Sequence, residues 1–287
     1  MAYRSSRPVE PLESRVLMAA GLPRPDHVVI VVEENHSYGQ IFGPVIPPIP
    51  VPADLRSTAP YIRSLARHGA SLRNARAETH PSQPNYLALF SGSTQGVTSD
   101  GTPDQPFTTP NLGGELIAAG LTFAGYSESM PSVGFTGSEA EGGLYARKHN
   151  PWVDFADVPA SANRPFADFP RRARDFASLP TVSFVVPNQE NDMHSGSVRT
   201  ADDWLRRHLK RYVRWARRHN SLLILAWDEG SGDSNHIATV FAGAHARRGQ
   251  YDQPVNHYDM LRTIEDMYDL PHAGASADAQ PITSIFR

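Results

Sequence analysis

Three short apolar runs, far apart along the chain, each lead into polar or acidic residues. They are His27–Val32, Thr181–Val186 and Ser221–Ala226, and aliphatic or β-branched side chains dominate each of them. Such runs are typical of strands buried on both faces of a parallel sheet. Because parallel strands end at one edge of an open α/β sheet, where binding sites gather, we expect the residues that follow the three runs to lie close together.

Helix-like segments separate these runs, and this alternation predicts an α/β protein. We expect a three-layer α/β/α sandwich with a mostly parallel central sheet. A chain of 287 residues can bury a large core without disulfides, and this one has no cysteine, which also excludes thiolate catalysis and zinc-thiolate sites. Four helices are predicted. The first covers about 59–68 and is capped by Ser57 or Thr58. The others cover 112–119, a segment that begins at Asp202 or Asp203, and 257–268.

The predicted domain organisation has one main unit. Residues 1–26 are expected to be a leader or a disordered N-terminal segment, and 27–287 a single domain. Residues 12–17 resemble a short leader of exported bacterial proteins, which predicts a secreted or periplasmic location. The proline-rich stretch 43–57 is interpreted as a surface loop. Residues 127–174 lack periodicity and form a candidate substrate-facing insertion.

Charge and hydropathy restrict the partners. With 27 basic and 30 acidic residues the net charge is −3, which argues against a nucleic-acid binder. No apolar run approaches the roughly 18 residues of a membrane span, so stable membrane insertion is not expected. We expect a small-molecule ligand and favour a monomer. The 12 histidines, several in polar segments, hint at metal or phosphate chemistry.

Two adjacent carboxylates, Asp228 and Glu229, follow the last of the three runs, and glycines come directly after them. Two carboxylates at one strand end must either repel each other or share a cation, and we adopt the second interpretation. The first run also ends in acidic residues, in the sequence Glu33-Glu34-Asn35.

A further polar segment, 79–85, precedes a helix. Pro84 suits the first helical turn, which places Ser82 or Gln83 at the N-cap. Backbone N–H groups and the helix dipole favour an anion there. The alternative interpretation is that Ser82 is a plain helix cap.

Six motifs in this order resemble the phosphoesterase family of bacterial acid phosphatases and phospholipases C, within the alkaline-phosphatase-like superfamily. The resemblance covers about residues 27–286 and is closest to the small secreted acid phosphatases. The motifs are Glu33-Glu34-Asn35-His36-Ser37-Tyr38, His80-Pro81-Ser82-Gln83-Pro84-Asn85-Tyr86, Lys148-His149-Asn150-Pro151, Asn191-Asp192-Met193-His194, Trp227-Asp228-Glu229-Gly230 with Asn235-His236, and Asn256-His257-Tyr258 to Glu265-Asp266.

The resemblance implies roles for individual residues. Ser82 would be the nucleophile and contact a single divalent metal ion, and His194 or His80 would supply a proton. Asn188 stands where two-metal phosphodiesterases of the superfamily carry an acid, which puts a second metal in doubt. The implied metal ligands are Glu34, Asn35, Asp228 and Glu229, and the implied substrate-binding residues are Asn85, Lys148, His149, Asp192 and His236.

This set of residues agrees with the needs of phosphate-ester hydrolysis, which requires a cation, an in-line nucleophile and a proton for the leaving oxygen. Oxygen donors suit Ca²⁺, Mg²⁺ or Mn²⁺ better than zinc. The sequence therefore favours a metal-dependent acid phosphatase that cleaves monoesters through a phosphoserine. One alternative is a phospholipase C-type phosphodiesterase. The other is a catalytically silent extracellular module in which the metal only stabilises the fold. Such a module would have little need of the Ser82 hydroxyl, so the presence of Ser82 argues against it. A sulfatase is disfavoured, because the chain lacks the C/S-x-P-x-R setting.

Overall fold

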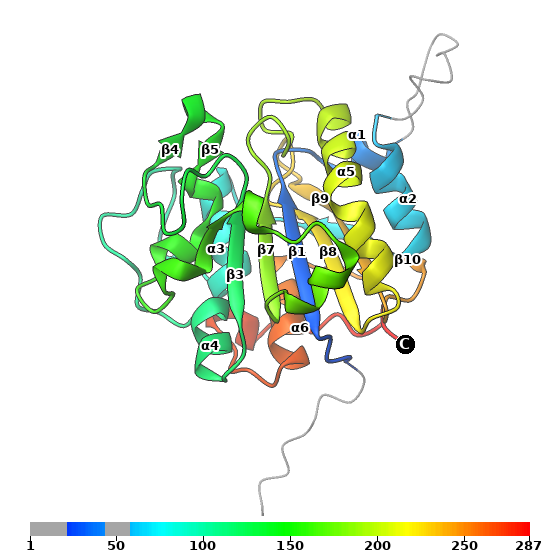
Figure 1. Cartoon of the computed structure of the whole chain (residues 1–287). Helices are drawn as coiled ribbons and strands as arrows, with labels where there is room; N and C mark the ends of the chain where they lie inside the picture. Colours follow the sequence, from blue (N-terminus) through cyan, green and yellow to red (C-terminus); the bar gives the residue numbers. More distant parts are fainter. Residues whose placement is uncertain (1–21, 44–57) are drawn as a thin grey trace, which may run out of the picture.

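An eight-stranded sheet runs through the part of the chain that the computed structural model describes, residues 22–43 and 58–287 (Figure 1). Residues 1–21 of the predicted leader (1–26) lie outside the described part of the chain. So do residues 44–57 of the predicted loop (43–57). The strand order is β10-β2-β9-β8-β1-β7-β3-β6. The strands are β1 His27–Glu33, β2 Ala70–Arg76, β3 Phe123–Ser127, β6 Asn163–Pro165, β7 Val182–Val186, β8 Ser221–Trp227, β9 His236–Gly243 and β10 Gly249–Tyr251.

The three apolar runs of the sequence are adjacent strands. β1 pairs in parallel with β8 on one side and with β7 on the other, so that Val28 lies opposite both Leu222 and Val182. β9 runs antiparallel to β8 and β2, whereas the remaining pairs are parallel. The predicted fold class, α/β with a mostly parallel central sheet, is confirmed. As a result, β1, β7 and β8 all end at the same edge.

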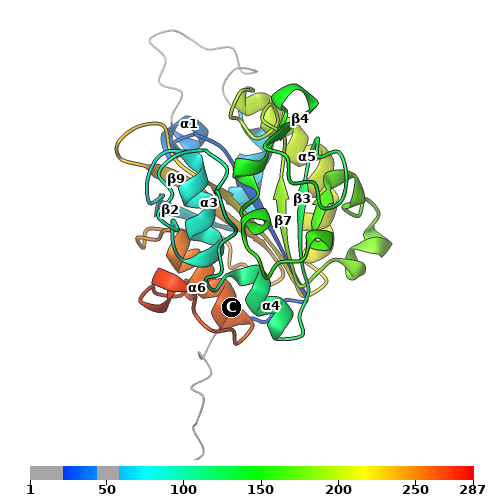
Figure 2. The ribbon, with the colours of Figure 1, turned by 90° about the vertical axis from the view of Figure 1, so that its left-hand side faces the viewer.

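Helices cover both faces of the sheet (Figures 1 and 2). α2 and α5 pack together on one face, and α3 and α6 pack together on the other. Among the described residues no helix is both long and apolar enough to cross a membrane. The helices are α1 Tyr38–Phe42, α2 Pro60–His68, α3 Ser82–Ser91, α4 Leu112–Ala118, α5 Val198–Ala216 and α6 His257–Met267.

The start of α5 differs from the sequence prediction. The helix begins at Val198, where the Ser197 hydroxyl accepts a hydrogen bond from the Thr200 amide at 3.1 Å. Asp202, predicted to open this helix, is a buried residue in its second turn. An acidic residue before an amphipathic stretch predicts a cap, but here a serine upstream already provides one.

Asp202 instead serves the neighbouring helix. Its two carboxylate oxygens accept hydrogen bonds from the amides of Tyr61 at 3.0 Å and Ile62 at 2.8 Å, in the first turn of α2. The N-cap of α2 is Ala59, which has no capping side chain, so Thr58 is not the cap, and Ser57, the other predicted cap, lies outside the described residues. A residue 140 positions away thus satisfies amides that a local cap would otherwise bind.

The segment 127–174 is folded against the sheet by short turns and aromatic packing. It contains the two-residue strands β4 Glu139–Ala140 and β5 Tyr145–Ala146, with 3₁₀ turns after them. Trp152 is buried against Gly125 of β3, where an added Cβ would lie 2.1 Å from the indole. This packing places Lys148 and His149 near the strand ends. A substrate-facing role for the whole segment stays a prediction.

Glu115 on α4 is an acidic side chain without a partner. Neither carboxylate oxygen has a hydrogen bond, although both are buried. Burial, followed by the negative charges of Glu265 and Asp157, raises the pKa of Glu115 to about 8. The folded protein therefore holds a proton on Glu115 over a pH range in which the unfolded chain, with its ordinary pKa near 4.5, has lost it.

Glu115→Gln is expected to stabilise the protein at pH 8 and to have little effect at pH 4. Because the folded-state pKa of this acid is raised, its contribution to stability falls as the pH rises from about 4.5 to about 8. Glutamine keeps the shape and removes the ionisation. Melting temperatures at both pH values test this, with the exposed Glu141→Gln as the control; an equal change at pH 4 and pH 8 contradicts the expectation.

Candidate functional site

The ends of β1 and β8 and the loop after β7 meet, as the sequence predicts. The Asp228 amide donates to the Glu33 carbonyl at 3.0 Å, and the Glu34 amide donates to the Asp192 carbonyl at 2.7 Å. The Asn35 amide donates to Asp228 Oδ1 at 3.1 Å. Backbone pairing at the sheet edge therefore brings together acidic side chains from three distant parts of the chain.

Ser82 is the first residue of α3, and Pro81 occupies the N-cap position. The serine is buried, and its Oγ lies 3.1 Å from Glu34 Oε2 and 3.2 Å from Glu229 Oε1. The interpretation of Ser82 as a plain helix cap is therefore wrong, because Pro81 holds the N-cap position and the Ser82 hydroxyl faces two carboxylates. The Gln83 amide in this first turn donates instead to Asp100 Oδ1 at 3.1 Å. The strand ends that carry Glu34 and Glu229 fix the position of the hydroxyl.

Asn85 holds the loop that leads into Ser82. Its Oδ1 accepts from the amides of Glu78 at 3.1 Å and Thr79 at 3.0 Å. Its Nδ2 donates to the carbonyls of Thr79 at 2.9 Å and Pro81 at 3.1 Å. These four bonds match the full capacity of an amide side chain. The contacts favour a positioning role over the substrate-binding role that the resemblance implies.

His80 forms the outer side of the site. Its Nδ1 pairs with Glu229 Oε2, and 46% of its side chain is exposed, whereas Ser82 is almost inaccessible. On the inner side, the Tyr86 hydroxyl donates to Glu34 Oε1. Sequence reasoning missed Tyr86, because a tyrosine in a helix that is buried along its length carries no signal of function.

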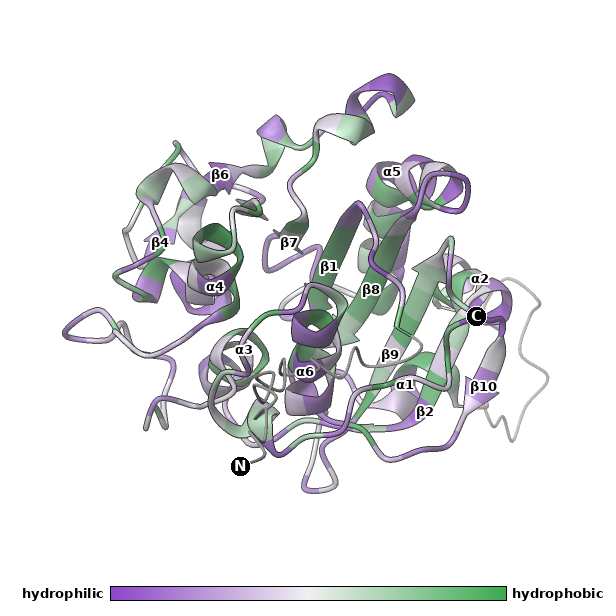
Figure 3. Cartoon of the chain, turned by 90° about the horizontal axis from the view of Figure 1, so that it is seen from below, coloured by the Kyte–Doolittle hydropathy of each residue, from purple (hydrophilic) through white to green (hydrophobic). Residues whose placement is uncertain are grey.

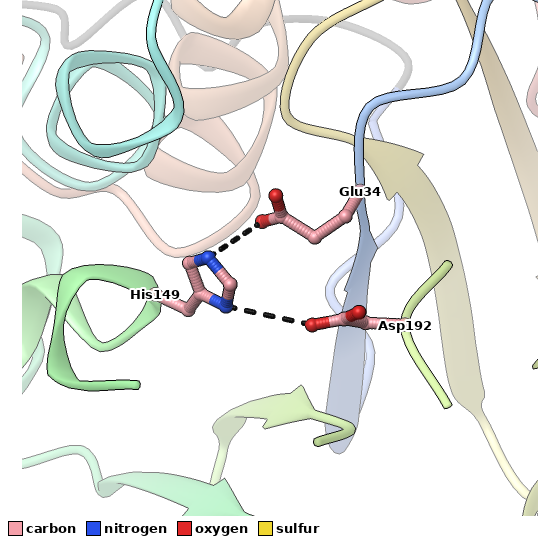
Figure 4. A group of neighbouring side chains, drawn as sticks. All are labelled: Glu34, His149 and Asp192. Atoms are coloured by element: carbon pink, nitrogen blue, oxygen red, sulfur yellow. Dashed lines mark ion pairs between the residues drawn. The ribbon is translucent and has the colours of Figure 1, made fainter. Parts of the chain in front are cut away.

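Glu34, His149 and Asp192 form a second, fully buried group (Figure 4). His149 Nε2 lies 3.3 Å from Glu34 Oε1, and His149 Nδ1 lies 3.5 Å from Asp192 Oδ2. One donor atom from each residue falls within 4.8 Å of the others, as a shared metal ion requires. The sequence places His149 and Asp192 around the substrate, whereas the structure groups them with a metal-ligand candidate.

The chemistry of this cluster fits a divalent cation. In this group and the adjacent strand ends, four buried polar atoms have no hydrogen-bond partner among the described residues. They are His149 Nε2, Asp192 Oδ2, Asn35 Oδ1 and Asp228 Oδ2. Burial, and then the charges of Glu34 and Glu229, raise the pKa of Asp228 well above its usual range, and burial raises the pKa of Asp192 to about 8. Buried carboxylates in contact are stabilised when a cation sits among them. The set contains one imidazole besides oxygen donors, so it does not identify the metal.

Lys148 and His194 lie at the open rim of the cluster. Lys148 Nζ donates to Asp100 Oδ2 at 2.8 Å and lies 3.4 Å from His194 Nε2. Burial, together with the charges of Lys148 and His149, lowers the pKa of His194 to about 4. Asp100 was not predicted, because it lies in a polar, turn-rich stretch without a recognisable motif.

His236 is not brought to Ser82 by the contacts of the described residues. It opens β9, its Nε2 lies 2.7 Å from the Arg73 carbonyl oxygen, and its ring stacks on Tyr38 at 4.8 Å between centroids. The substrate-binding role implied by the resemblance remains a prediction for this residue. The adjacent Asn235 has a clearer position, because it bonds both the Gly230 amide and the Thr79 carbonyl.

A buried ion pair supports the two loops from below. His257 Nδ1 pairs with Glu78, and its Nε2 lies 2.9 Å from the Trp227 carbonyl. Both partners accept hydrogen bonds, so the ring carries a proton on each nitrogen. Burial alone would lower the pKa of His257, but Glu78 and the Trp227 carbonyl raise it. The pair ties the segment before His80 to the strand end before Asp228.

Comparisons with known proteins identify related sequences and folds. Residues 55–271 match the model of the Phosphoesterase family. The chain is 49% identical to a phosphatidylinositol-3-phosphatase of Mycobacterium tuberculosis, over 94% of this chain and 86% of that protein. It is 30% identical to a probable acid phosphatase of Kluyveromyces lactis, over 73% of this chain but only 54% of that protein. A solved alkaline phosphatase superfamily protein from Vibrio parahaemolyticus has the same fold, with a TM-score of 0.60 and 12% sequence identity. The match covers 90% of this chain and 72% of that protein.

Removal of divalent ions is expected to lower the melting temperature by roughly 5–10 °C. An ion present at about 100 times its dissociation constant stabilises a protein by about 2.7 kcal/mol, and 1 kcal/mol shifts Tm by about 2–4 °C at this size. Asp228→Asn removes one of the clustered charges, so this variant should respond much less to chelation.

Thermal melts with chelator, and after re-addition of Ca²⁺, Mg²⁺, Mn²⁺ or Zn²⁺, provide the measurement. Asp278→Asn, at an exposed position, is the matched control and should respond like the wild type. A wild-type Tm that is unchanged after verified removal of metal would count against a metal site in this cluster.

Proposed function

The chain belongs to the phosphoesterase family, and we propose that it is a metal-dependent phosphatase that cleaves phosphate monoesters through a covalent phosphoserine on Ser82. It is a phosphoric ester hydrolase, as its relatives are. One observation carries the proposed mechanism: the Ser82 hydroxyl is buried at the start of α3 between the carboxylates of Glu34 and Glu229.

The names of the relatives favour a monoester substrate. They are a phosphatidylinositol-3-phosphatase and acid phosphatases, which remove a terminal phosphate group. This supports the monoesterase over the phospholipase C-type alternative, and it disfavours a catalytically silent module. A secreted or periplasmic location stays a prediction.

A divalent ion held by Glu34, Asn35, Asp228 and Glu229 would lower the pKa of the serine hydroxyl and offset the charge of the phosphoryl oxygens. Ser82 Oγ attacks the phosphorus atom, and its proton passes to one of the carboxylates that it already contacts. The bond from phosphorus to the ester oxygen breaks as the bond to Oγ forms. The positive end of the α3 helix dipole favours an anion at this position.

The rim residues complete the reaction. Lys148 lies where its ammonium group can pair with a phosphoryl oxygen, in place of its present partner Asp100. His194 lies 3.4 Å from Lys148, and its pKa is lowered in the free protein; the negative charge of a bound phosphate ester would favour its protonated form, which donates a proton to the departing alkoxide. In the second half, the same imidazole takes a proton from water, whose oxygen attacks phosphorus and releases Ser82 and inorganic phosphate.

A polar hollow of about 240 Å³ adjoins this rim and supports a hydroxyl-bearing leaving group. Apart from Ala146, the side chains that line it are polar or charged, and they include no aromatic ring on which a base could stack. They are Gln83, Asp100, Thr102, Ser138, Glu139, Arg147, Lys148 and Gln189.

Ser82→Ala is expected to lower kcat by several orders of magnitude while KM and the fold change little. The substitution removes a bond that forms only along the reaction path. Steady-state kinetics and acid trapping with a radiolabelled phosphate ester measure this, and the wild type should carry label on Ser82. Ser91→Ala, on the same helix but bonded to the Leu87 carbonyl, is the control. Turnover of Ser82→Ala within a few-fold of the wild type, without trapped label, would show that water is the nucleophile.

His194→Ala is expected to slow alkyl phosphates far more than activated aryl phosphates. Protonation of a poor leaving group by a general acid is worth typically 10²–10⁴-fold, whereas an aryl oxide departs without it. The kcat/KM values for glycerol phosphate and a nitrophenyl phosphate test this, with His272→Ala as the control. Equal losses on both substrates would assign His194 to phosphate binding instead.

A further inference from the structure

The outer side of α5 and the turn that follows it carry a dense group of basic side chains. Seven of the thirteen residues from Arg206 to Arg218 are arginine or lysine, none is acidic, and all seven are exposed. We call these seven side chains the polybasic face. They make up about a quarter of the 27 basic residues of a chain whose net charge is −3. In Figure 3, α5 shows hydrophilic colouring, in contrast to the hydrophobic strands β1 and β8.

The polybasic face is hollowed on both sides. Six of its seven cations line a hollow of about 460 Å³, together with Trp215. A second hollow of about 290 Å³ lies toward α2, and both are lined by Lys210 and Arg214. The Arg211 guanidinium donates to the Arg171 carbonyl at 2.9 Å, which brings the basic stretch 171–174 alongside.

Most of these cations have no acidic partner. Within residues 22–43 and 58–287, one member of the face, Arg206, forms an ion pair, with Asp203 at 3.5 Å. Like charges four residues apart, such as Lys210 with Arg214, destabilise a helix. A face needed only for solubility would be better served by mixed charges. The concentration of unpaired positive charge therefore indicates an anionic partner.

We propose that the polybasic face binds the surface of an anionic lipid bilayer. The helical part of the face, from Arg206 to Arg214, is about 12 Å long at 1.5 Å per residue, and each basic side chain near an anionic bilayer adds to the attraction. Trp215 lies half-buried among the cations with its ring stacked on His219 at 4.4 Å, and an indole suits the boundary between headgroups and water. Such binding is peripheral and requires no membrane-spanning helix.

The position of α5 determines how this surface lies relative to the catalytic edge. The helix begins at Val198, four residues after His194, and then runs away from the sheet edge that bears Ser82 (Figure 1). Because α5 covers the opposite face of the sheet from α3, which carries Ser82, docking through α5 leaves the helix that bears the serine away from the bilayer. Hydrolysis at that edge rests on the proposed function, whereas bilayer binding itself does not require turnover.

Sedimentation with lipid vesicles tests the proposal. We expect the wild type to bind vesicles of phosphatidylcholine with about 30% phosphatidylglycerol, to lose binding as salt is raised, and to ignore pure phosphatidylcholine. Lys210→Glu with Arg214→Glu should weaken binding by at least about tenfold. Arg247→Glu with Arg248→Glu makes the same change in charge at exposed positions outside α5, and should bind nearly as well as the wild type.

Both double variants should hydrolyse a soluble phosphate ester at the wild-type rate, which controls for folding. The proposal is overturned if the wild type does not prefer anionic vesicles, or if the two variants lose binding equally. It is also overturned if Lys210 and Arg214 are needed to bind DNA but not vesicles, since the partner is then a nucleic acid. Failure of the proposed function would appear differently, as intact vesicle binding without hydrolysis of the soluble ester.

Discussion

The structure depends on carboxylates that are forced together in a buried place. Two strand ends and the loop after β7 are joined by backbone hydrogen bonds, and this brings together four buried carboxylates. They belong to Glu34, Asp192, Asp228 and Glu229. Burial of charge without compensation is strongly unfavourable, so the arrangement calls for a cation or for protons. The same constraint places the Ser82 hydroxyl between the carboxylates of Glu34 and Glu229, either of which can accept its proton.

The rest of the edge holds this cluster in place. Asn85 fills its hydrogen-bonding capacity on the backbone of 78–81, and His257 ties Glu78 to the carbonyl before Asp228. These residues act through others, by fixing the two loops whose side chains meet at the site. The supporting side chains have hydrogen-bond partners. In contrast, several oxygen and nitrogen atoms of the site have no hydrogen-bond partner in the described residues and could bind a metal ion.

Local sequence patterns predict some elements of this protein correctly and fail for others. The apolar runs were recognisable as strands because burial on both faces leaves few polar positions. The predicted caps of α2 and α5 are wrong, because Ser197 caps α5 and the amides of α2 are bound by Asp202, which is distant in sequence. Ser82 was expected at the cap, but Pro81 takes that position and turns the hydroxyl toward the carboxylates.

By itself, the sequence determined the α/β class, the strand ends that carry the site and the family to which the chain belongs, because periodicity and short motifs are local properties. Only the tertiary structure decided which of the polar residues contact one another at the site and which bind the backbone instead. It grouped His149 and Asp192 with Glu34, turned Asn85 to the backbone and directed His236 toward Arg73. Strand order, register and side-chain direction decide which atoms meet, and they arise from packing between segments that lie far apart along the chain.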